Sequence, residues 1–254
     1  MAYIRTRAIA LRCTDYSETS QVVALCTPDL GQVHGLARGA RRPRKDGRMP
    51  FDLLTHYDVV LSRRKPGHLH LLTEWSVVES FPGLRHDLRC FWMACHAAEA
   101  VLSCTSENPD DGPVYQSLLT CLRCMGRGNK ANISHFDFLI GMFRVMGCLP
   151  VTDRCVGCNG PLTGPTRFSS GAGGALCGDC GMSRPDAFPV SRGALAVIER
   201  LARKDRPSHS LRIMSSQVAE IRRAFNEQIQ YYLGRPLRTS RFLTTEPGGR
   251  ITGD

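Results

Sequence analysis

The sequence predicts an α+β protein of several domains, with a small β-barrel at the N-terminal end and a helical region after it. Apolar residues alternate with polar ones up to about residue 80, which is the period of β-strands. From residue 81 to about residue 243 they recur with a helical period, and two Cys-x2-Cys pairs interrupt this pattern. We therefore expect domains at 1–80 and 81–243, an insertion at 151–189 and a polar, disordered tail at 244–254.

Strand patterns fill the N-terminal domain. Each is a run rich in β-branched and apolar residues that ends at a polar or Gly/Pro turn, such as Asp15–Glu18 or Pro28–Gly31. Five such strands and one long loop fit a small closed barrel of the OB type; a β-sandwich ranks second because it needs more strands. The predicted strands are Tyr3–Cys13, Gln21–Thr27, Gln32–Ala37, Phe51–Ser62 and His68–Val78.

A strongly basic loop follows the third predicted strand. Residues 38–48 contain six basic residues and one acid, Asp46, and Pro43 and Gly47 make a helix or strand unfavourable there. Such a loop on a small barrel is typical of a protein that binds nucleic-acid phosphates, and the alternative is a solvated loop without a partner. The predicted DNA-binding residues are Arg38, Arg41, Arg42, Arg44, Lys45 and Arg48, extended by Arg63, Arg64 and Lys65 in the next basic turn.

Three aromatic residues of the barrel are candidates for stacking with bases. OB barrels bind single strands in a cationic groove with aromatic platforms, and Tyr16, Phe51 and Tyr57 could supply them. An ordinary core position is the favoured interpretation for each. His68 and His70 lie on one face of the fifth strand, and we expect half-buried polar residues there rather than metal ligands.

Helical patterns begin after Phe81-Pro82-Gly83. Pro113 suits the first position of a helix, and Ser134 with Asp137 has the spacing of a capping box. The helix after Ser134 is apolar nearly all round, so we expect it at the centre of a bundle with Phe138 and Phe143 buried. The predicted helices are Leu84–Cys104, Pro113–Met125, one from Ser134 to about Cys148, Ser191–Lys204 and Ser215–Leu233.

Four of the 12 cysteines have the spacing of a metal site. Cys155, Cys158, Cys177 and Cys180 form Cys-x2-Cys-x18-Cys-x2-Cys, which predicts one structural Zn²⁺ per chain as the core of the insertion. Four thiolates complete a tetrahedron and leave no position for water or substrate. A redox pair or a lost metal is the alternative. The tight turns would depend on Gly157, Asn159, Gly160, Gly178 and Gly181.

The other eight cysteines occur within apolar runs and are expected to be reduced packing residues. Cys121 and Cys124 also form a Cys-x2-Cys pair, but they fall in a predicted helix with no glycine between them. The N-terminus lacks an apolar signal core, and no apolar run approaches the roughly 20 residues of a membrane span. The expected location is therefore the bacterial cytoplasm, without a membrane partner.

The net charge of +10 is concentrated at the two ends of the chain, which favours a binding surface built from both. No phosphate-binding Gly-Lys-Ser/Thr loop or Gly-x-Ser-x-Gly elbow is present, and His96 and Glu99 have the wrong spacing for a zinc deaminase. We expect a protein without catalytic activity. The alternative is a nucleic-acid modifying enzyme that uses its barrel and zinc modules to hold the substrate.

Several segments, taken in order, resemble the RecO family of bacterial recombination mediators. They are Ala8–Leu11, Asp15–Ser20 with Thr27 and Gly31, Ala37–Arg42, the four cysteines, and Leu233–Leu243. The family's common loop has fewer charges than Pro43–Lys45. The resemblance implies an N-terminal OB domain, a helical domain and a zinc finger.

The same resemblance implies a non-enzymatic role in recombinational repair. Members of the family bind single- and double-stranded DNA and anneal complementary strands. They work with RecR and the single-strand-binding protein, and they help to load the recombinase. A protein that binds DNA in this role would be associated with the nucleoid.

Overall fold

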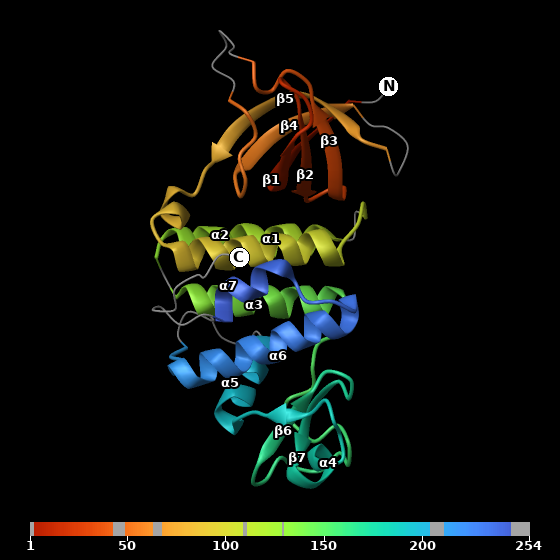
Figure 1. Cartoon of the computed structure of the whole chain (residues 1–254), viewed down its shortest axis with the longest axis vertical. Helices are drawn as coiled ribbons and strands as arrows, with labels where there is room; N and C mark the ends of the chain where they lie inside the picture. Colours follow the sequence, from red (N-terminus) through yellow and green to blue (C-terminus); the bar gives the residue numbers. More distant parts are fainter. Residues whose placement is uncertain are drawn as a thin grey trace, which may run out of the picture. The chain divides into compact units, whose positions relative to one another are not determined.

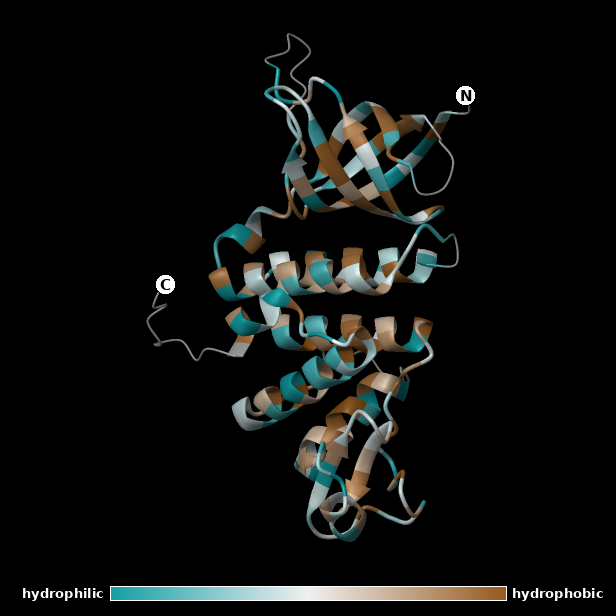
Figure 2. Ribbon diagram, turned by 45° about the vertical axis from the view of Figure 1, so that its right-hand side comes forward, coloured by the Kyte–Doolittle hydropathy of each residue, from teal (hydrophilic) through white to brown (hydrophobic). Residues whose placement is uncertain are grey.

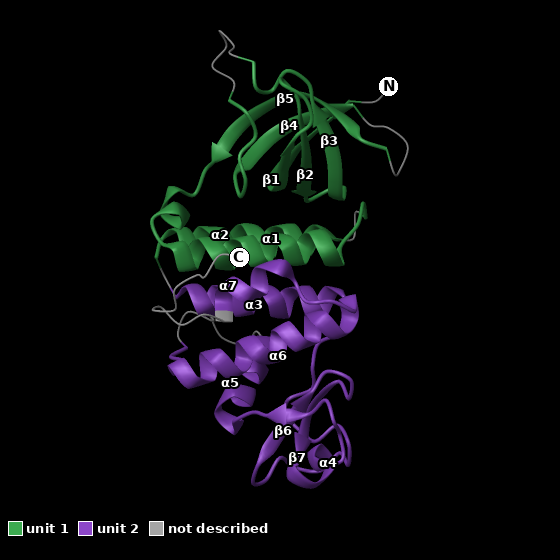
Figure 3. Cartoon of the chain, in the orientation of Figure 1, with its two compact units in different colours: residues 1–129 green, residues 130–254 purple. Residues whose placement is uncertain are grey.

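The computed structural model describes residues 3–42, 49–62, 68–108, 111–128, 130–203 and 211–244 (Figure 1). The chain forms two compact units, residues 1–129 and 130–254 (Figure 3). The first two helices therefore belong to the same unit as the strands. The domain boundary at 80/81 remains a prediction, and it coincides with the change from strands to helices. The predicted disordered tail falls almost wholly outside the described residues.

The first unit contains a closed barrel of five strands with the neighbour order β1-β2-β3-β5-β4 (Figure 1). All pairs are antiparallel except β3 with β5, where Gly35–Ala37 run parallel to His70–Leu72. The strands are β1 (Tyr3–Asp15), β2 (Gln21–Thr27), β3 (Gly31–Ala37), β4 (His56–Ser62) and β5 (His70–Glu79). The predicted strands are thus confirmed, although β4 begins later than Phe51.

Strand β1 closes the barrel because it pairs with β2 and also with β4, the strands next to it at the two ends of the sheet order. Its first half pairs with β4, with Tyr3 opposite Ser62, and its second half pairs with β2, with Asp15 opposite Gln21. A register shift between Ala10 and Arg12 marks the region where the pairing changes. Such a shift bends a strand, which a small barrel requires.

Hydrophobic residues alternate with hydrophilic ones along the strands (Figure 2). The buried hydrophobic residues form the core of the barrel. Phe51 packs against Tyr57 and Trp75, with ring centroids 4.7 and 5.0 Å away. The Tyr57 hydroxyl accepts a hydrogen bond from the Asp52 amide at 2.8 Å, and burial raises the pKa of Tyr57 to about 12. The core interpretation of Phe51 and Tyr57 is confirmed.

A helical hairpin belongs to the same unit as the barrel. Helix α1 (Leu88–Cys104) begins later than predicted, because a 3-10 helix (Pro82–Arg85) precedes it and Asp87 caps it. Helix α2 (Gly112–Gly126) follows and carries Cys121 and Cys124 inside it, as predicted.

Buried contacts join this hairpin to the barrel. His56 Nε2 and the Tyr115 hydroxyl share a hydrogen bond of 2.8 Å. A side chain at Gly31 would collide with the backbone of Ser106 and Asn108. The unit is therefore a barrel and a helix pair that pack as one body.

The second unit is built on α3 (Ala131–Val145), α5 (Arg192–Arg203), α6 (Ser215–Leu233) and the short α7 (Arg241–Thr244). Phe138 and Phe143 are both buried, as predicted. The ring of Phe225 in α6 makes T-shaped contacts with the rings of Phe136 and Phe143, at centroid distances of 5.6 and 5.4 Å.

The predicted capping box at Ser134 is wrong, because α3 begins at Ala131. The chain enters this helix through Lys130, whose φ of 47° is left-handed. The Ser134 amide already donates to the Lys130 carbonyl at 3.1 Å, so Ser134 lies inside the first turn.

The insertion at 151–189 lies between α3 and α5 and is not helical throughout. It holds a three-stranded sheet in the order β7-β6-β8, from β6 (Thr166–Ser169), β7 (Gly174–Cys177) and β8 (Phe188–Pro189). Helix α4 (Gly178–Met182) follows β7 directly. Cys155, Leu176 and Ala187 form a small apolar cluster, so this segment has a modest core besides any metal. None of the helices in the described ranges is long and apolar enough to span a bilayer.

Candidate metal centre and nucleic-acid interface

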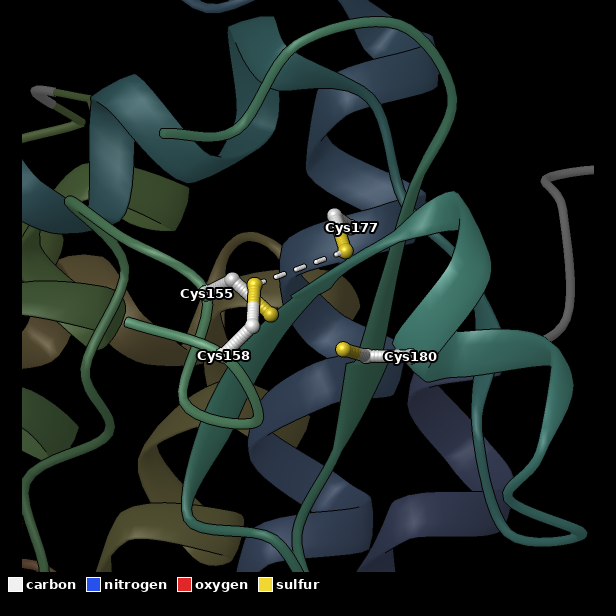
Figure 4. A group of neighbouring side chains, drawn as sticks. All are labelled: Cys155, Cys158, Cys177 and Cys180. Atoms are coloured by element: carbon white, nitrogen blue, oxygen red, sulfur yellow. Dashed lines mark hydrogen bonds between the residues drawn. The ribbon is translucent and has the colours of Figure 1, made fainter. Parts of the chain in front are cut away.

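The four predicted cysteines converge in the insertion (Figure 4). Their sulfur atoms all lie within 4.8 Å of one another, and no disulfide joins them. The Sγ atoms of Cys158 and Cys177, for example, are 4.0 Å apart. Sulfurs around a tetrahedral zinc are separated by about 3.8 Å, since zinc–sulfur bonds are about 2.3 Å long. The arrangement can hold one metal ion, and it is compatible with zinc.

Two tight turns bring the pairs together. In the first, the Asn159 amide donates to the Cys155 carbonyl at 2.8 Å and the Cys155 amide donates to Gly160 at 2.9 Å. Asn159 has a φ of 60°, so its predicted left-handed turn is confirmed. In the second, β7 ends at Cys177 and α4 carries Cys180 one helical turn further on.

The glycines act differently from what the sequence predicts. None of Gly157, Gly160, Gly178 and Gly181 has a positive φ. The constraint at Gly157 is close approach, because a Cβ atom there would lie 3.0 Å from the sulfur of Cys180. Gly157 therefore leaves room for the opposite pair of ligands.

The electrostatics of the cluster favour a cation. Burial opposes ionisation of Cys155, but hydrogen bonds from the backbone of Cys177, Cys158 and Gly157 outweigh it and lower the pKa of Cys155 to about 6. Hydrogen bonds with the other three sulfurs raise the pKa of Cys180 to about 12. Four thiolates cannot ionise side by side without a positive charge, and a divalent metal supplies it.

A second candidate site is a cleft of about 660 Å³ on the barrel. One wall is the β1–β2 turn, with Tyr16, Ser17, Thr19 and Ser20. The other wall is the end of β3 and the residues that follow it. It is formed by Leu36, Arg38, Gly39 and Arg42.

Hydrogen bonds hold the two walls together. The Arg41 amide donates to the Thr19 carbonyl at 3.0 Å, and the Gly39 amide donates to the Ser20 hydroxyl at 3.5 Å. Within the turn, the Tyr16 amide donates to the Ser20 carbonyl at 2.9 Å. The turn and the start of the basic loop are thus fixed relative to each other.

The predicted basic residues are used in different ways. Arg38 and Arg42 are exposed and line the cleft. Arg41 instead pairs with Asp15, with Nη1 2.9 Å from a carboxylate oxygen. The other predicted DNA-binding residues lie outside the described residues; they are Arg44, Lys45, Arg48, Arg63, Arg64 and Lys65.

Several residues of these sites were not identified from the sequence. The polar turn at Asp15–Glu18 was recognised, but the polar side chains that line the cleft, Ser17, Thr19 and Ser20, were not assigned to a site. The core interpretation is wrong for Tyr16, which is 69% exposed. The half-buried expectation is also wrong for the two histidines, since His70 is buried beside Glu107 and His68 is exposed.

These features define a protein with a basic cleft on a small barrel and, in an insertion between two helices, a cluster of four cysteines that can hold a metal ion. Two family descriptions cover nearly all of it: "Recombination protein O N terminal" matches residues 1–81, and "Recombination protein O C terminal" matches residues 85–241. The chain belongs to the RecO family.

Curated relatives agree with this assignment. "DNA repair protein RecO" of Anaeromyxobacter dehalogenans strain 2CP-C is 30% identical over 96% of both chains. The protein of the same name from Symbiobacterium thermophilum is 31% identical over 96% of this chain and 98% of its own. That from Anaeromyxobacter strain Fw109-5 is 32% identical over 99% of this chain and 98% of its own. The family is one of DNA repair proteins.

Proposed function

We propose that this protein is a non-catalytic mediator of recombinational DNA repair that binds single- and double-stranded DNA and anneals complementary strands. With RecR, it helps to load the recombinase onto strands coated by the single-strand-binding protein. It acts in the bacterial cytoplasm, at the nucleoid. Its family membership supports the repair role.

The cleft on the barrel is the main observation that supports the proposed DNA binding. Two exposed guanidinium groups, Arg38 and Arg42, stand in it without a carboxylate among the lining residues. We assign the barrel to the OB type, in which the β1–β2 loop and the face of β2 and β3 bind oligonucleotides. The wall that holds Tyr16 is that loop. We also assign DNA binding to the basic residues at 44–48 and 63–65, which lie outside the described residues.

The four cysteines hold one Zn²⁺ with a structural role. All four sulfurs serve as ligands, so the closed tetrahedron has no position for a substrate. Its contribution is to fold the insertion, whose apolar cluster is small. We assign the domains as 1–80 and 81–243, with the finger at 151–189.

An annealing assay tests the proposed function. Complementary labelled oligonucleotides should anneal faster with the protein than without it, with no divalent metal added. The variant that combines Arg38→Ala and Arg42→Ala should lose most of this acceleration, because annealing requires two anionic strands on one cationic surface.

The matched control combines Arg5→Ala and Arg7→Ala. It removes the same charge from exposed residues at the opposite end of β1. If both double variants anneal like the parent, the cleft is not the DNA site. Metal-dependent turnover of labelled DNA or RNA would instead support a nucleic-acid modifying enzyme.

A further inference from the structure

Tyr16 is an exposed aromatic side chain on a rigid turn. It is 69% exposed, whereas Phe51, Tyr57 and Trp75 of the same barrel are buried. The turn is held by the Tyr16 and Ser17 amides, which both donate to the Ser20 carbonyl, at 2.9 and 3.4 Å. A phenol ring held in water in this way has its apolar face available for a planar partner.

The neighbours of Tyr16 determine which partner fits. Arg38 and Arg42 line the same cleft and can bind phosphate oxygens. Small hydroxyl side chains and the half-buried Leu36 line the rest of this cleft of about 660 Å³. A planar group joined to a phosphodiester, which is a nucleotide, matches this combination.

The ion pair of Arg41 and Asp15 keeps the cleft suitable for an anion. Asp15 is next to Tyr16, and its carboxylate would repel phosphate if it were not neutralised. The Arg41 amide also holds Thr19 at 3.0 Å. Arg41 is therefore a positioning residue rather than a direct phosphate contact.

We propose that the cleft is a subsite for one unpaired nucleobase, with Tyr16 as the stacking platform that makes the protein prefer single strands. This inference rests on the proposed DNA binding. In a duplex both faces of each base are covered by neighbouring bases, so only an unstacked base can place its face on Tyr16.

The test compares Tyr16→Ala with Tyr16→Phe in the full chain. The probes are a fluorescent oligothymidylate, an oligomer of equal length made of abasic nucleotides, and a duplex. Tyr16→Ala should weaken binding of oligothymidylate by about 5- to 150-fold, the range expected for loss of one stacked base. Binding of the abasic oligomer and the duplex should not change, and Tyr16→Phe should bind like the parent.

Tyr3→Ala is the matched control, since Tyr3 is 65% exposed at the other end of β1. The fluorescence of a 2-aminopurine base in the probe should be quenched when the parent protein binds, and it should be quenched less when Tyr16→Ala binds. The inference is overturned if Tyr16→Ala leaves oligothymidylate binding unchanged, or weakens all three probes equally. If the Arg38 and Arg42 variant still weakens binding in that case, the cleft remains the DNA site and the proposed function stands. If neither variant has an effect, the cleft is not the DNA site and this inference falls with it.

Discussion

Arg222 and Leu243 are joined by a hydrogen bond in which Nη1 of the arginine donates to the leucine carbonyl at 2.7 Å. The other terminal nitrogen donates to the Asn132 side-chain oxygen at 2.8 Å. Because these residues lie on α6, α7 and α3, one guanidinium group connects three helices of the second unit.

Replacing Arg222 with Ala should therefore destabilise the protein by about 2–4 kcal/mol. Hydrogen bonds to charged groups contribute about 1.5–3 kcal/mol each, and part of the side chain is exposed to solvent. Urea unfolding measures the change. Arg212→Ala, at an exposed position, should cost less than about 0.5 kcal/mol. Equal stability of the two variants would contradict the role of this hydrogen bond.

The metal centre predicts a measurable stoichiometry. Purified protein should contain about one equivalent of Zn²⁺, and Cys158→Ser should lower the zinc content and the thermal stability of the second unit. Cys124→Ser, in the helical Cys-x2-Cys pair, should retain the metal. Full stability of metal-free protein would show that the centre is not structural.

The two core phenylalanines predict large costs of truncation. Phe138→Ala and Phe143→Ala should each lower the free energy of unfolding by about 3–5 kcal/mol, because both rings are buried. Val145→Ala, at a position 40% exposed on the same helix, is the control. A cost below about 1 kcal/mol at Phe143 would mean that the core relaxes around the cavity.

The basic cleft predicts a change in salt dependence. Affinity falls with salt, and each phosphate contact on a single strand contributes about −0.7 to the slope of log affinity against log salt. Removing Arg38 and Arg42 should therefore make this slope shallower by about 1.4. Arg41→Ala should reduce the slope less, because its guanidinium is paired with Asp15. Fluorescence anisotropy at several salt concentrations measures both. An unchanged slope in the folded double variant would make Arg235, Arg238 and Arg241 the leading candidates.

Asp87 predicts a dependence of stability on pH. Its carboxylate accepts hydrogen bonds from the Cys90 and Arg89 amides, and the bond from Cys90 is the main reason that its pKa is lowered. Asp87→Ala should cost about 1 kcal/mol at neutral pH, the usual value of an N-cap. Because the folded pKa is lowered, this contribution is complete above the unfolded pKa of about 3.9 and disappears as the pH falls through the folded value. Urea unfolding of both proteins between pH 3 and 7 should show the difference narrowing in acid; a constant difference would contradict the charge effect.

Elements bounded by strong turn signals could be predicted from the sequence. Strand β2 and helix α6 were predicted with their observed ends, since polar or Gly residues bracket each apolar pattern. The four cysteines that converge were also predicted, because the spacing within each Cys-x2-Cys pair depends on local chain geometry. The starts of α1 and α3 were not predicted. Helix α1 begins where the Asp87 side chain caps it, and α3 begins after Lys130, whose left-handed backbone no pattern of apolar residues specifies.

The properties of the cleft depend on pairing between distant segments. The sequence placed Tyr16 in a turn and Tyr57 in a strand, but it did not show that Tyr16 is exposed. The barrel register places Tyr57 inside. The salt bridge of Arg41 likewise requires that the β1–β2 turn meet the end of β3. The composition showed that this region is basic. The tertiary structure was needed to show that Arg38 and Arg42 line the cleft whereas Arg41 pairs with Asp15.

The sharing of β1 between two neighbours has a consequence for synthesis on the ribosome. Tyr3 pairs with Ser62, so the first half of β1 has no β4 partner until that residue has left the exit tunnel. Until then it is an edge that can pair with another nascent chain. An extension fused before Tyr3 would lie beside this late-closing seam.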